Sequence, residues 1–115
     1  VLKKKYFELN RFYFGKETFI DDQIAIEWAR IPHFYYGYYV YQYATGISAA
    51  IALCQKVMNG GMKERAAYLN FLKSGSSQFP VDLLKQAGVD MRSTKPLEEA
   101  IQKFASLTPT LETLL

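Results

Sequence analysis

A long apolar stretch from Tyr38 to Val57 limits the folds that this chain can adopt. Polar residues interrupt it, among them Gln42, Thr45, Ser48 and Gln55. A membrane span needs about 20 predominantly apolar residues, so this composition favours a helix buried within a protein. We therefore predict the longest helix of the chain over residues 38–58, and we expect no membrane partner.

Small residues recur at every fourth position of this predicted helix: Ala44, Ser48 and Ala52. Because residues four apart lie on one face of a helix, this stripe allows a neighbouring helix to approach closely. Gly46 lies in the same segment, where glycine costs about 1 kcal/mol relative to alanine. That cost predicts either a close backbone contact at Gly46 or a functional reason for a glycine there.

Glycines and prolines divide the rest of the chain into segments whose apolar residues have helical spacing. Helices are predicted at residues 1–14, from Asp21 or Asp22 to before Pro32, at residues 63–72, from Pro80 to before Gly88, and from Ser93 or Thr94 onward. Thr108-Pro109 either kinks this last helix or starts another. No segment alternates for long enough to predict a strand. We predict an all-α fold, with residues 1–115 forming a single helical domain.

Composition narrows the function. The net charge of +3 is mild, and beyond Lys3–Lys5 the charges are interleaved in sign, which argues against a nucleic-acid partner. A single cysteine, Cys54, rules out an internal disulfide and favours a reduced, cytoplasmic setting. We predict that Cys54 is a small core residue rather than a reactive thiol.

Tyrosines are concentrated in one place. Six of the nine fall between Tyr35 and Tyr43, just after the only histidine, His33. A buried phenol needs a hydrogen-bond partner, so this cluster favours a polar pocket with aromatic walls. If the chain is helical from Tyr35, one face holds Tyr35, Tyr38 and Gln42, and another holds Tyr36, Tyr39 and Tyr43. The alternative is that these rings fill a core in which His33 is a satisfied polar group.

Residues Ile31–Tyr36 and Tyr39–Gly46 together resemble the C-terminal signature of the oligoendopeptidase F family. Two further segments agree with that family in order and spacing: Phe71–Ser77 with Pro80, and Leu83–Met91. The likeness runs from Tyr13 to the end of the chain. The combination of segments is specific, although no single segment is.

The resemblance implies a member of the thimet-like zinc peptidases, whose complete enzymes bind zinc through an HExxH helix and a further glutamate. In these enzymes the HExxH glutamate activates a zinc-bound water. Tyrosines and a histidine of the C-terminal region hold the substrate and the developing oxyanion. The implied substrates are oligopeptides, and the implied partner is the N-terminal part of the enzyme that carries HExxH.

Site residues follow from the same resemblance. Residues 35–38 match the Tyr-Tyr-Gly-Tyr pattern of thimet oligopeptidase, which makes Tyr38 the phenol that stabilises the oxyanion and Tyr35 a second, assisting phenol. Substrate binding is assigned to His33, Tyr36, Tyr39 and Tyr41. Tyr39 and Tyr41 belong to the oligoendopeptidase form of the motif and are alternatives for the roles of Tyr38 and Tyr35.

The chain departs from the family pattern because it contains no HExxH sequence and only one histidine. A catalytic zinc needs three protein ligands and an open position, so we expect no metal ligands in this chain and zinc only in the parent enzyme. Alone, the chain is expected to be inactive and to self-associate through exposed apolar surface. The competing hypothesis is a free-standing helical module that binds peptides or a partner helix in a tyrosine-lined groove.

We expect the isolated chain of 115 residues to be helical by circular dichroism and to lack peptidase activity with or without added zinc. The reason is the single histidine, which leaves the ligand set of a catalytic zinc incomplete. Hydrolysis of a quenched-fluorescence peptide and the metal content of the purified chain provide the measurement. Stoichiometric zinc together with turnover would contradict the fragment hypothesis.

Overall fold

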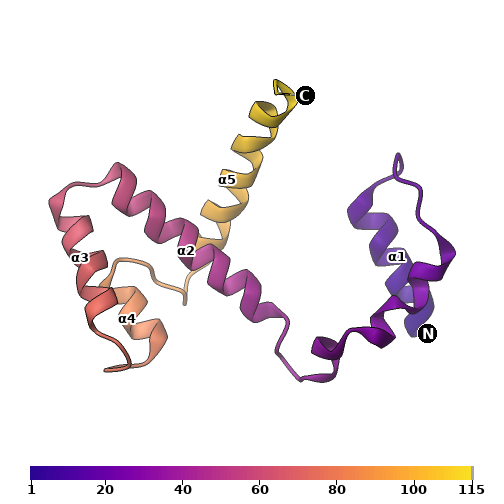
Figure 1. Cartoon of the computed structure of the whole chain (residues 1–115), viewed down its shortest axis with the longest axis horizontal. Helices are drawn as coiled ribbons and strands as arrows, with labels where there is room; N and C mark the ends of the chain where they lie inside the picture. Colours follow the sequence, from indigo (N-terminus) through magenta and orange to yellow (C-terminus); the bar gives the residue numbers. More distant parts are fainter. Residues whose placement is uncertain (115) are drawn as a thin grey trace. The chain divides into compact units, whose positions relative to one another are not determined.

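The computed structural model describes residues 1–114, and all the regular secondary structure in that range is helical (Figure 1). The predicted all-α fold is confirmed. Backbone contacts divide the chain into two compact units, residues 1–40 and residues 41–115, and each is described by itself. The single domain predicted over residues 1–115 stays a prediction.

The first unit consists of one α-helix and two 3-10 helices: α1 (Leu2–Phe14), η1 (Asp22–Arg30) and η2 (Pro32–Tyr35). Helix α1 packs along η1. Gly15 ends α1 with a φ of 79°, a left-handed value that glycine adopts without a Cβ clash. Its N–H donates to the carbonyl of Arg11. The helix predicted over residues 1–14 is confirmed.

A side-chain cap begins η1 and a proline ends it. The Asp21 carboxylate accepts a 2.8 Å hydrogen bond from the backbone N–H of Gln23. Ile31 has an extended backbone (φ −91°, ψ 103°) because the ring of Pro32 disfavours a helical conformation in the preceding residue. Both predicted boundaries are confirmed, although the helix is 3-10 rather than α.

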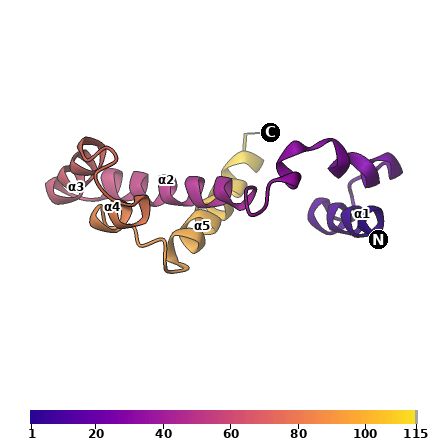
Figure 2. The same ribbon diagram turned by 90° about the horizontal axis from the view of Figure 1, so that it is seen from below.

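The second unit contains four α-helices: α2 (Tyr41–Asn59), α3 (Met62–Lys73), α4 (Pro80–Gln86) and α5 (Lys95–Glu112). Figures 1 and 2 both show α5 crossing α2, and these helices are in contact. Ser48 and Ala52 of the predicted stripe are buried, and Ala52 shares a small cavity with Pro96 of α5. The stripe therefore lies where a second helix approaches, except that Ala44 at its start is exposed.

A small apolar core holds the second unit together. Its buried members are Ala52, Leu53, Ala87 and Val89, with Tyr68, Phe71, Leu84 and Met91 packed against them. These residues come from α2, α3, α4 and the segment after α4. The core therefore packs α2, α3 and α4 together through residues that are far apart in the sequence.

Helix α4 ends in a Schellman motif centred on Gly88, which has a φ of 89°. The N–H of Gly88 donates to the carbonyl of Lys85 at 2.9 Å. The N–H of Val89 donates to the carbonyl of Leu84 at 2.8 Å. This turn directs Val89, which is 2% exposed, into the core.

The structure differs from the sequence predictions at the start of α2 and at Cys54, and it decides between the two alternatives for Pro109. Helix α2 begins at Tyr41 rather than at residue 38, since Tyr38 has a φ of 57° and an α-helix needs a φ near −63°. Cys54 is exposed, so its prediction as a core residue is wrong. It follows buried Leu53 by one position, which places it about 100° further around the helix axis. Helix α5 continues through Pro109 as one helix.

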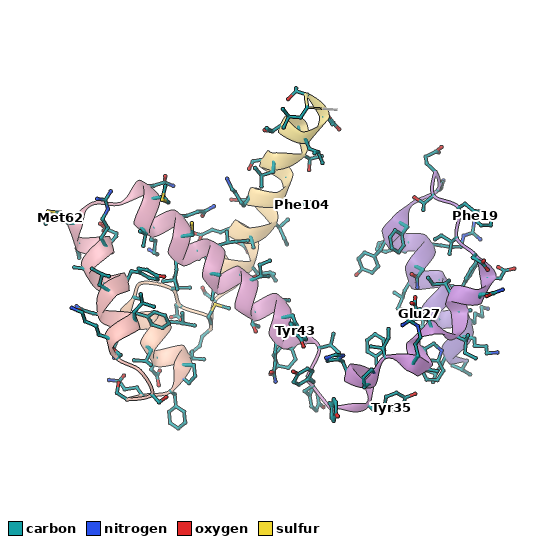
Figure 3. The ribbon with its side chains drawn as sticks, in the orientation of Figure 1. Phe19, Glu27, Tyr35, Tyr43, Met62 and Phe104 are labelled. Carbon is teal, nitrogen blue, oxygen red and sulfur yellow. The ribbon has the colours of Figure 1, made fainter. Side chains whose placement is uncertain are left out.

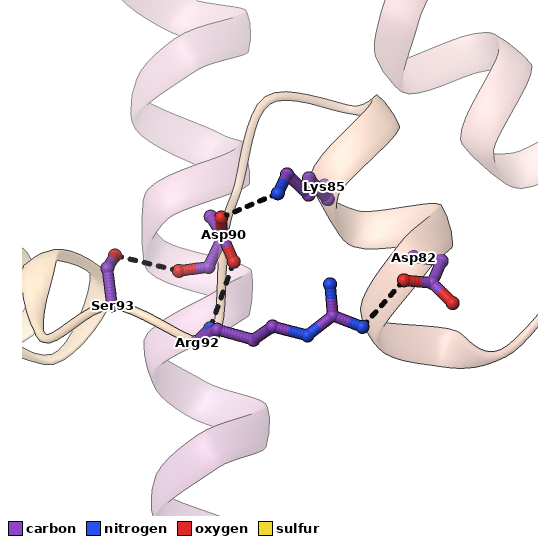
Figure 4. Close-up of polar contacts among 5 residues, drawn as sticks. All are labelled: Asp82, Lys85, Asp90, Arg92 and Ser93. Carbon is purple, nitrogen blue, oxygen red and sulfur yellow. Dashed lines mark hydrogen bonds and ion pairs between the residues drawn. The ribbon is translucent and has the colours of Figure 1, made fainter.

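A network of polar contacts joins α4 to the segment before α5 (Figure 4). The Asp90 carboxylate accepts a 3.0 Å hydrogen bond from the backbone N–H of Arg92 and lies 3.2 Å from Lys85 Nζ. The Arg92 guanidinium donates to the Asp82 carboxylate at 2.8 Å. The Arg92 N–H, and after it the Lys85 ammonium, lower the pKa of Asp90 from its ordinary value.

We expect Asp90→Asn to lower the stability of the protein at neutral pH and to have a smaller effect in acid. Because folding lowers the pKa of Asp90, the ionised carboxylate stabilises the folded state above the ordinary pKa of 3.8. This contribution is lost as the pH falls through the lower pKa of the folded state. Thermal unfolding of the variant and its parent across the acidic range measures the difference. An equal difference at every pH would show that ionised Asp90 makes no such contribution.

Gly60→Ala is expected to destabilise the second unit by about 1–3 kcal/mol, the usual cost of overpacking. A Cβ at Gly60 would overlap the carbonyl oxygen of Lys56 and would lie 2.8 Å from the Cβ of Glu64. The matched control is Gly46→Ala, because a Cβ there meets no atom within 4 Å. Gly46→Ala is expected to stabilise α2 by about 1 kcal/mol. Chemical denaturation tests both, and a stabilising Gly60→Ala would contradict the close approach.

Candidate functional site

The predicted site residues lie between residues 33 and 41, from η2 to the first residue of α2. His33 and Tyr35 belong to η2, and residues 36–39 follow it as a turn. Tyr41 begins α2 and belongs to the second unit. Residues 33–39 are therefore the part of the candidate site that the first unit holds.

The turn places Tyr38 in an unusual backbone conformation. The N–H of Tyr39 donates to the carbonyl of Tyr36 at 3.3 Å, and Tyr38 between them has a φ of 57°. A positive φ at the third residue of such a turn normally requires glycine, and a bulky residue there is an outlier. The two helical faces predicted from residue 35 are therefore wrong, because the chain turns before α2 begins.

The side chains of the clustered tyrosines are exposed to solvent and do not form a buried core. Tyr38 is 90% exposed, and Tyr35, Tyr36, Tyr41 and Tyr43 are also exposed. Tyr39 is 37% exposed, the lowest value of the cluster, and His33 is half-buried. Within the described chain these rings are exposed rather than packed in a core, and Tyr38 has the largest exposed fraction among them.

Ring contacts gather three of the predicted substrate-binding residues. His33 and Tyr39 stack with their ring centroids 5.5 Å apart, and Tyr36 meets Tyr39 edge-on at 5.9 Å. Phe34 meets Tyr6 of α1 edge-on at 6.4 Å, which joins η2 to the first helix. The structure thus brings His33, Tyr36 and Tyr39 together.

Tyr35 faces a different partner. Its hydroxyl donates a 2.8 Å hydrogen bond to the backbone carbonyl of Ala29 at the end of η1 (Tyr35 is labelled in Figure 3). The single hydroxyl hydrogen is therefore used inside the first unit in this conformation. The role of Tyr35 as a second oxyanion donor stays a prediction.

The part of the chain that the structure describes offers neither a metal site nor a membrane span. Among residues 1–114, no group of three His, Cys, Asp or Glu side chains is arranged to hold a metal ion. No helix in the same range is long and apolar enough to cross a membrane. An open depression of about 580 Å³ follows η1 beside the ion pair of Glu27 and Arg30, but the tyrosines do not line it.

Two features of this site could not be predicted from the sequence: the positive φ of Tyr38 and the hydrogen bond from Tyr35 to the Ala29 carbonyl. The signal nearest to Tyr38 is Gly37, which indicates a turn but would itself be the residue expected to take a positive φ. The acceptor for Tyr35 is a backbone carbonyl, which every residue carries and which no side-chain pattern marks. Neither feature has a signature in the sequence.

The family of the chain follows from comparison with known proteins. The sequence profile of Peptidase family M3 matches residues 1–103, and the chain belongs to this family. It is 51% identical to oligopeptidase PepF of Bacillus subtilis over the whole chain and 17% of that protein. It is 46% identical to the chromosomal oligoendopeptidase F of Lactococcus lactis subsp. cremoris, over 99% of the chain and 19% of that protein. The resemblance to oligoendopeptidase F is therefore confirmed.

A solved structure agrees with these relatives. The crystal structure of a Chlamydophila abortus protein, described as a candidate peptidase, matches 99% of this chain with a TM-score of 0.84 and 43% identity. The match covers 19% of that protein. The chain thus spans less than a fifth of the length of these relatives.

Proposed function

We propose that this chain is the C-terminal substrate-binding part of a zinc metalloendopeptidase that cleaves oligopeptides in the cytoplasm. The observation that carries the proposal is the turn at residues 36–39, which holds the ring of Tyr38 exposed beside the group of His33, Tyr36 and Tyr39. Membership of Peptidase family M3 and identity to proteins named oligoendopeptidases support the reaction class.

Zinc does not fit the residues of this chain. Three protein ligands are needed, whereas the chain has one histidine and no group of three ligating side chains among residues 1–114. The metal of the complete enzyme would be bound by residues outside this chain. The reaction steps assigned to this chain are therefore those of its own side chains.

Tyr38 acts as a hydrogen-bond donor to the oxyanion that forms when water attacks the scissile carbonyl. A phenol suits this role because it is an uncharged donor at neutral pH and has few rotatable bonds. The bond strengthens as negative charge develops on the oxygen, so it stabilises the transition state more than the bound substrate. An exposed hydroxyl reaches such a substrate without a rearrangement of the unit.

His33, Tyr36 and Tyr39 form an aromatic wall for the peptide. The resemblance to oligoendopeptidase F assigns a substrate contact to Tyr41 as well, at the start of α2. The contacts between the rings of the wall restrict their orientations. Less conformational entropy is therefore lost when a peptide binds. Aromatic faces and edges accept many side chains. This wall suits a peptidase that accepts oligopeptides of varied sequence.

The remainder of the protein is the partner of this chain. Leu97, Ile101 and Phe104 recur at helical spacing on α5, and all three are more than half exposed (Phe104 is labelled in Figure 3). An apolar row of this kind is typical of a surface that another part of a protein covers. We propose that the part carrying HExxH covers it, and that the isolated chain self-associates through it.

In the full-length enzyme, Tyr38→Phe is expected to lower kcat by about a hundred- to a thousandfold, or about 2.7–4 kcal/mol, with KM little changed. The substitution removes one donor to the oxyanion and keeps the ring. The control is Tyr43→Phe, which lies outside the proposed site and should retain turnover. Kinetics on one quenched-fluorescence peptide, with bound zinc checked in each variant, provide the measurement.

The same experiment tests the assignment of residues. If Tyr38→Phe keeps full turnover while Tyr39→Phe or Tyr41→Phe loses it, the oxyanion role belongs to another tyrosine of the motif. If all these variants are fully active, the aromatic cluster is structural and the proposed site is wrong.

A further inference from the structure

Tyr35 ties the tyrosine segment to the preceding helix. Its hydroxyl donates at 2.8 Å to the carbonyl of Ala29, six residues earlier in the chain. The bond spans the junction at which η1 ends and Pro32 begins η2. It therefore connects the two 3-10 helices directly.

The backbone hydrogen bonds around this junction constrain the segment less than the hydrogen bond of Tyr35 does. Each joins residues three positions apart, and the donor-to-acceptor distances are 3.3 Å for Ile31 to Trp28, 3.2 Å for Phe34 to Ile31, 3.3 Å for Tyr36 to His33, and 3.3 Å for Tyr39 to Tyr36. Such bonds set the local turns but not the direction of the segment relative to η1. The Tyr35 bond is shorter than these bonds and spans twice the sequence separation.

The turn after Tyr35 depends on support from its surroundings. Tyr38 has a φ of 57°, which a tyrosine does not favour by itself. A conformation of this kind persists where neighbouring structure holds it in place. Tyr35 is the last residue of η2 and comes directly before the turn that contains Tyr38.

We propose that Tyr35 is a positioning residue, whose bond to the Ala29 carbonyl fixes the η1–η2 junction and thereby holds the turn that presents Tyr38. The inference rests on the proposed function and changes the role that the resemblance assigns to Tyr35. A phenol has one hydrogen to donate, so the bond to Ala29 and a bond to an oxyanion exclude each other.

The test is Tyr35→Phe in the full-length protein, which removes the hydroxyl and keeps the ring. We expect kcat to fall about three- to tenfold, the size of one hydrogen bond between uncharged groups. KM should rise, because His33 and Tyr39 belong to the same segment. Backbone hydrogen exchange of residues 33–39 should become faster, which the loss of a purely catalytic donor would not cause.

Two variants serve as controls. Tyr13→Phe makes the same chemical change on an exposed tyrosine of α1 and should alter neither the exchange rate nor turnover. Tyr38→Phe should lower kcat without changing the exchange of residues 33–39. Zinc content and the thermal midpoint are measured in every variant to detect global damage.

Several results would overturn the proposal. A loss of kcat of about a hundredfold or more in Tyr35→Phe, with unchanged exchange, would make Tyr35 a direct oxyanion donor. Unchanged exchange with unchanged kinetics would leave the Ala29 bond without a role, and faster exchange with unchanged kinetics would separate it from catalysis. If Tyr38→Phe is fully active while Tyr35→Phe still speeds exchange and impairs turnover, the oxyanion assignment fails and the positioning role stands.

Discussion

The crossing of α5 over the small residues of α2 is the contact that joins α5 to the rest of the second unit, whose apolar core comes from α2, α3, α4 and the segment after α4. Ser48 and Ala52 present little more than a β-carbon each, so the two helix backbones approach closely. The buried Ser48 hydroxyl donates to the carbonyl of Ala44 at 2.7 Å, so its burial leaves no polar group without a partner. In proteins most of the stability of a helix comes from tertiary packing rather than from intrinsic propensity, and this crossing supplies such packing.

The path from α4 to α5 makes that crossing specific. Gly88 reverses the chain with a left-handed φ, and Val89 then enters the core beside Ala52. Asp90 holds the following turn through the N–H of Arg92 and the ammonium of Lys85. A buried apolar residue and an exposed polar network therefore act on neighbouring positions, and together they fix where α5 begins.

The candidate site in the first unit contains a strained backbone position. The backbone of Tyr38 is one that its own side chain disfavours, and that ring is also the most exposed of the tyrosine cluster. Sequences usually agree with their structure at every level, and disagreements concentrate where function requires a particular geometry. Two interactions lie next to this turn: the stacking of His33 on Tyr39 and the hydrogen bond from Tyr35 to Ala29.

The amino-acid sequence was sufficient to predict the fold class, the boundaries at Gly15 and Pro32, and the resemblance to oligoendopeptidase F. These features are local, because a glycine or proline limits the backbone of its own residue and its neighbour, and a motif is read from consecutive side chains. Three features became visible in the folded chain alone: the exposure of Cys54, the start of α2 after Tyr38, and the hydrogen bond from Tyr35 to Ala29. These depend on which surfaces the packing of neighbouring elements covers and on backbone groups that all residues share, so no pattern of side chains in the sequence specifies them.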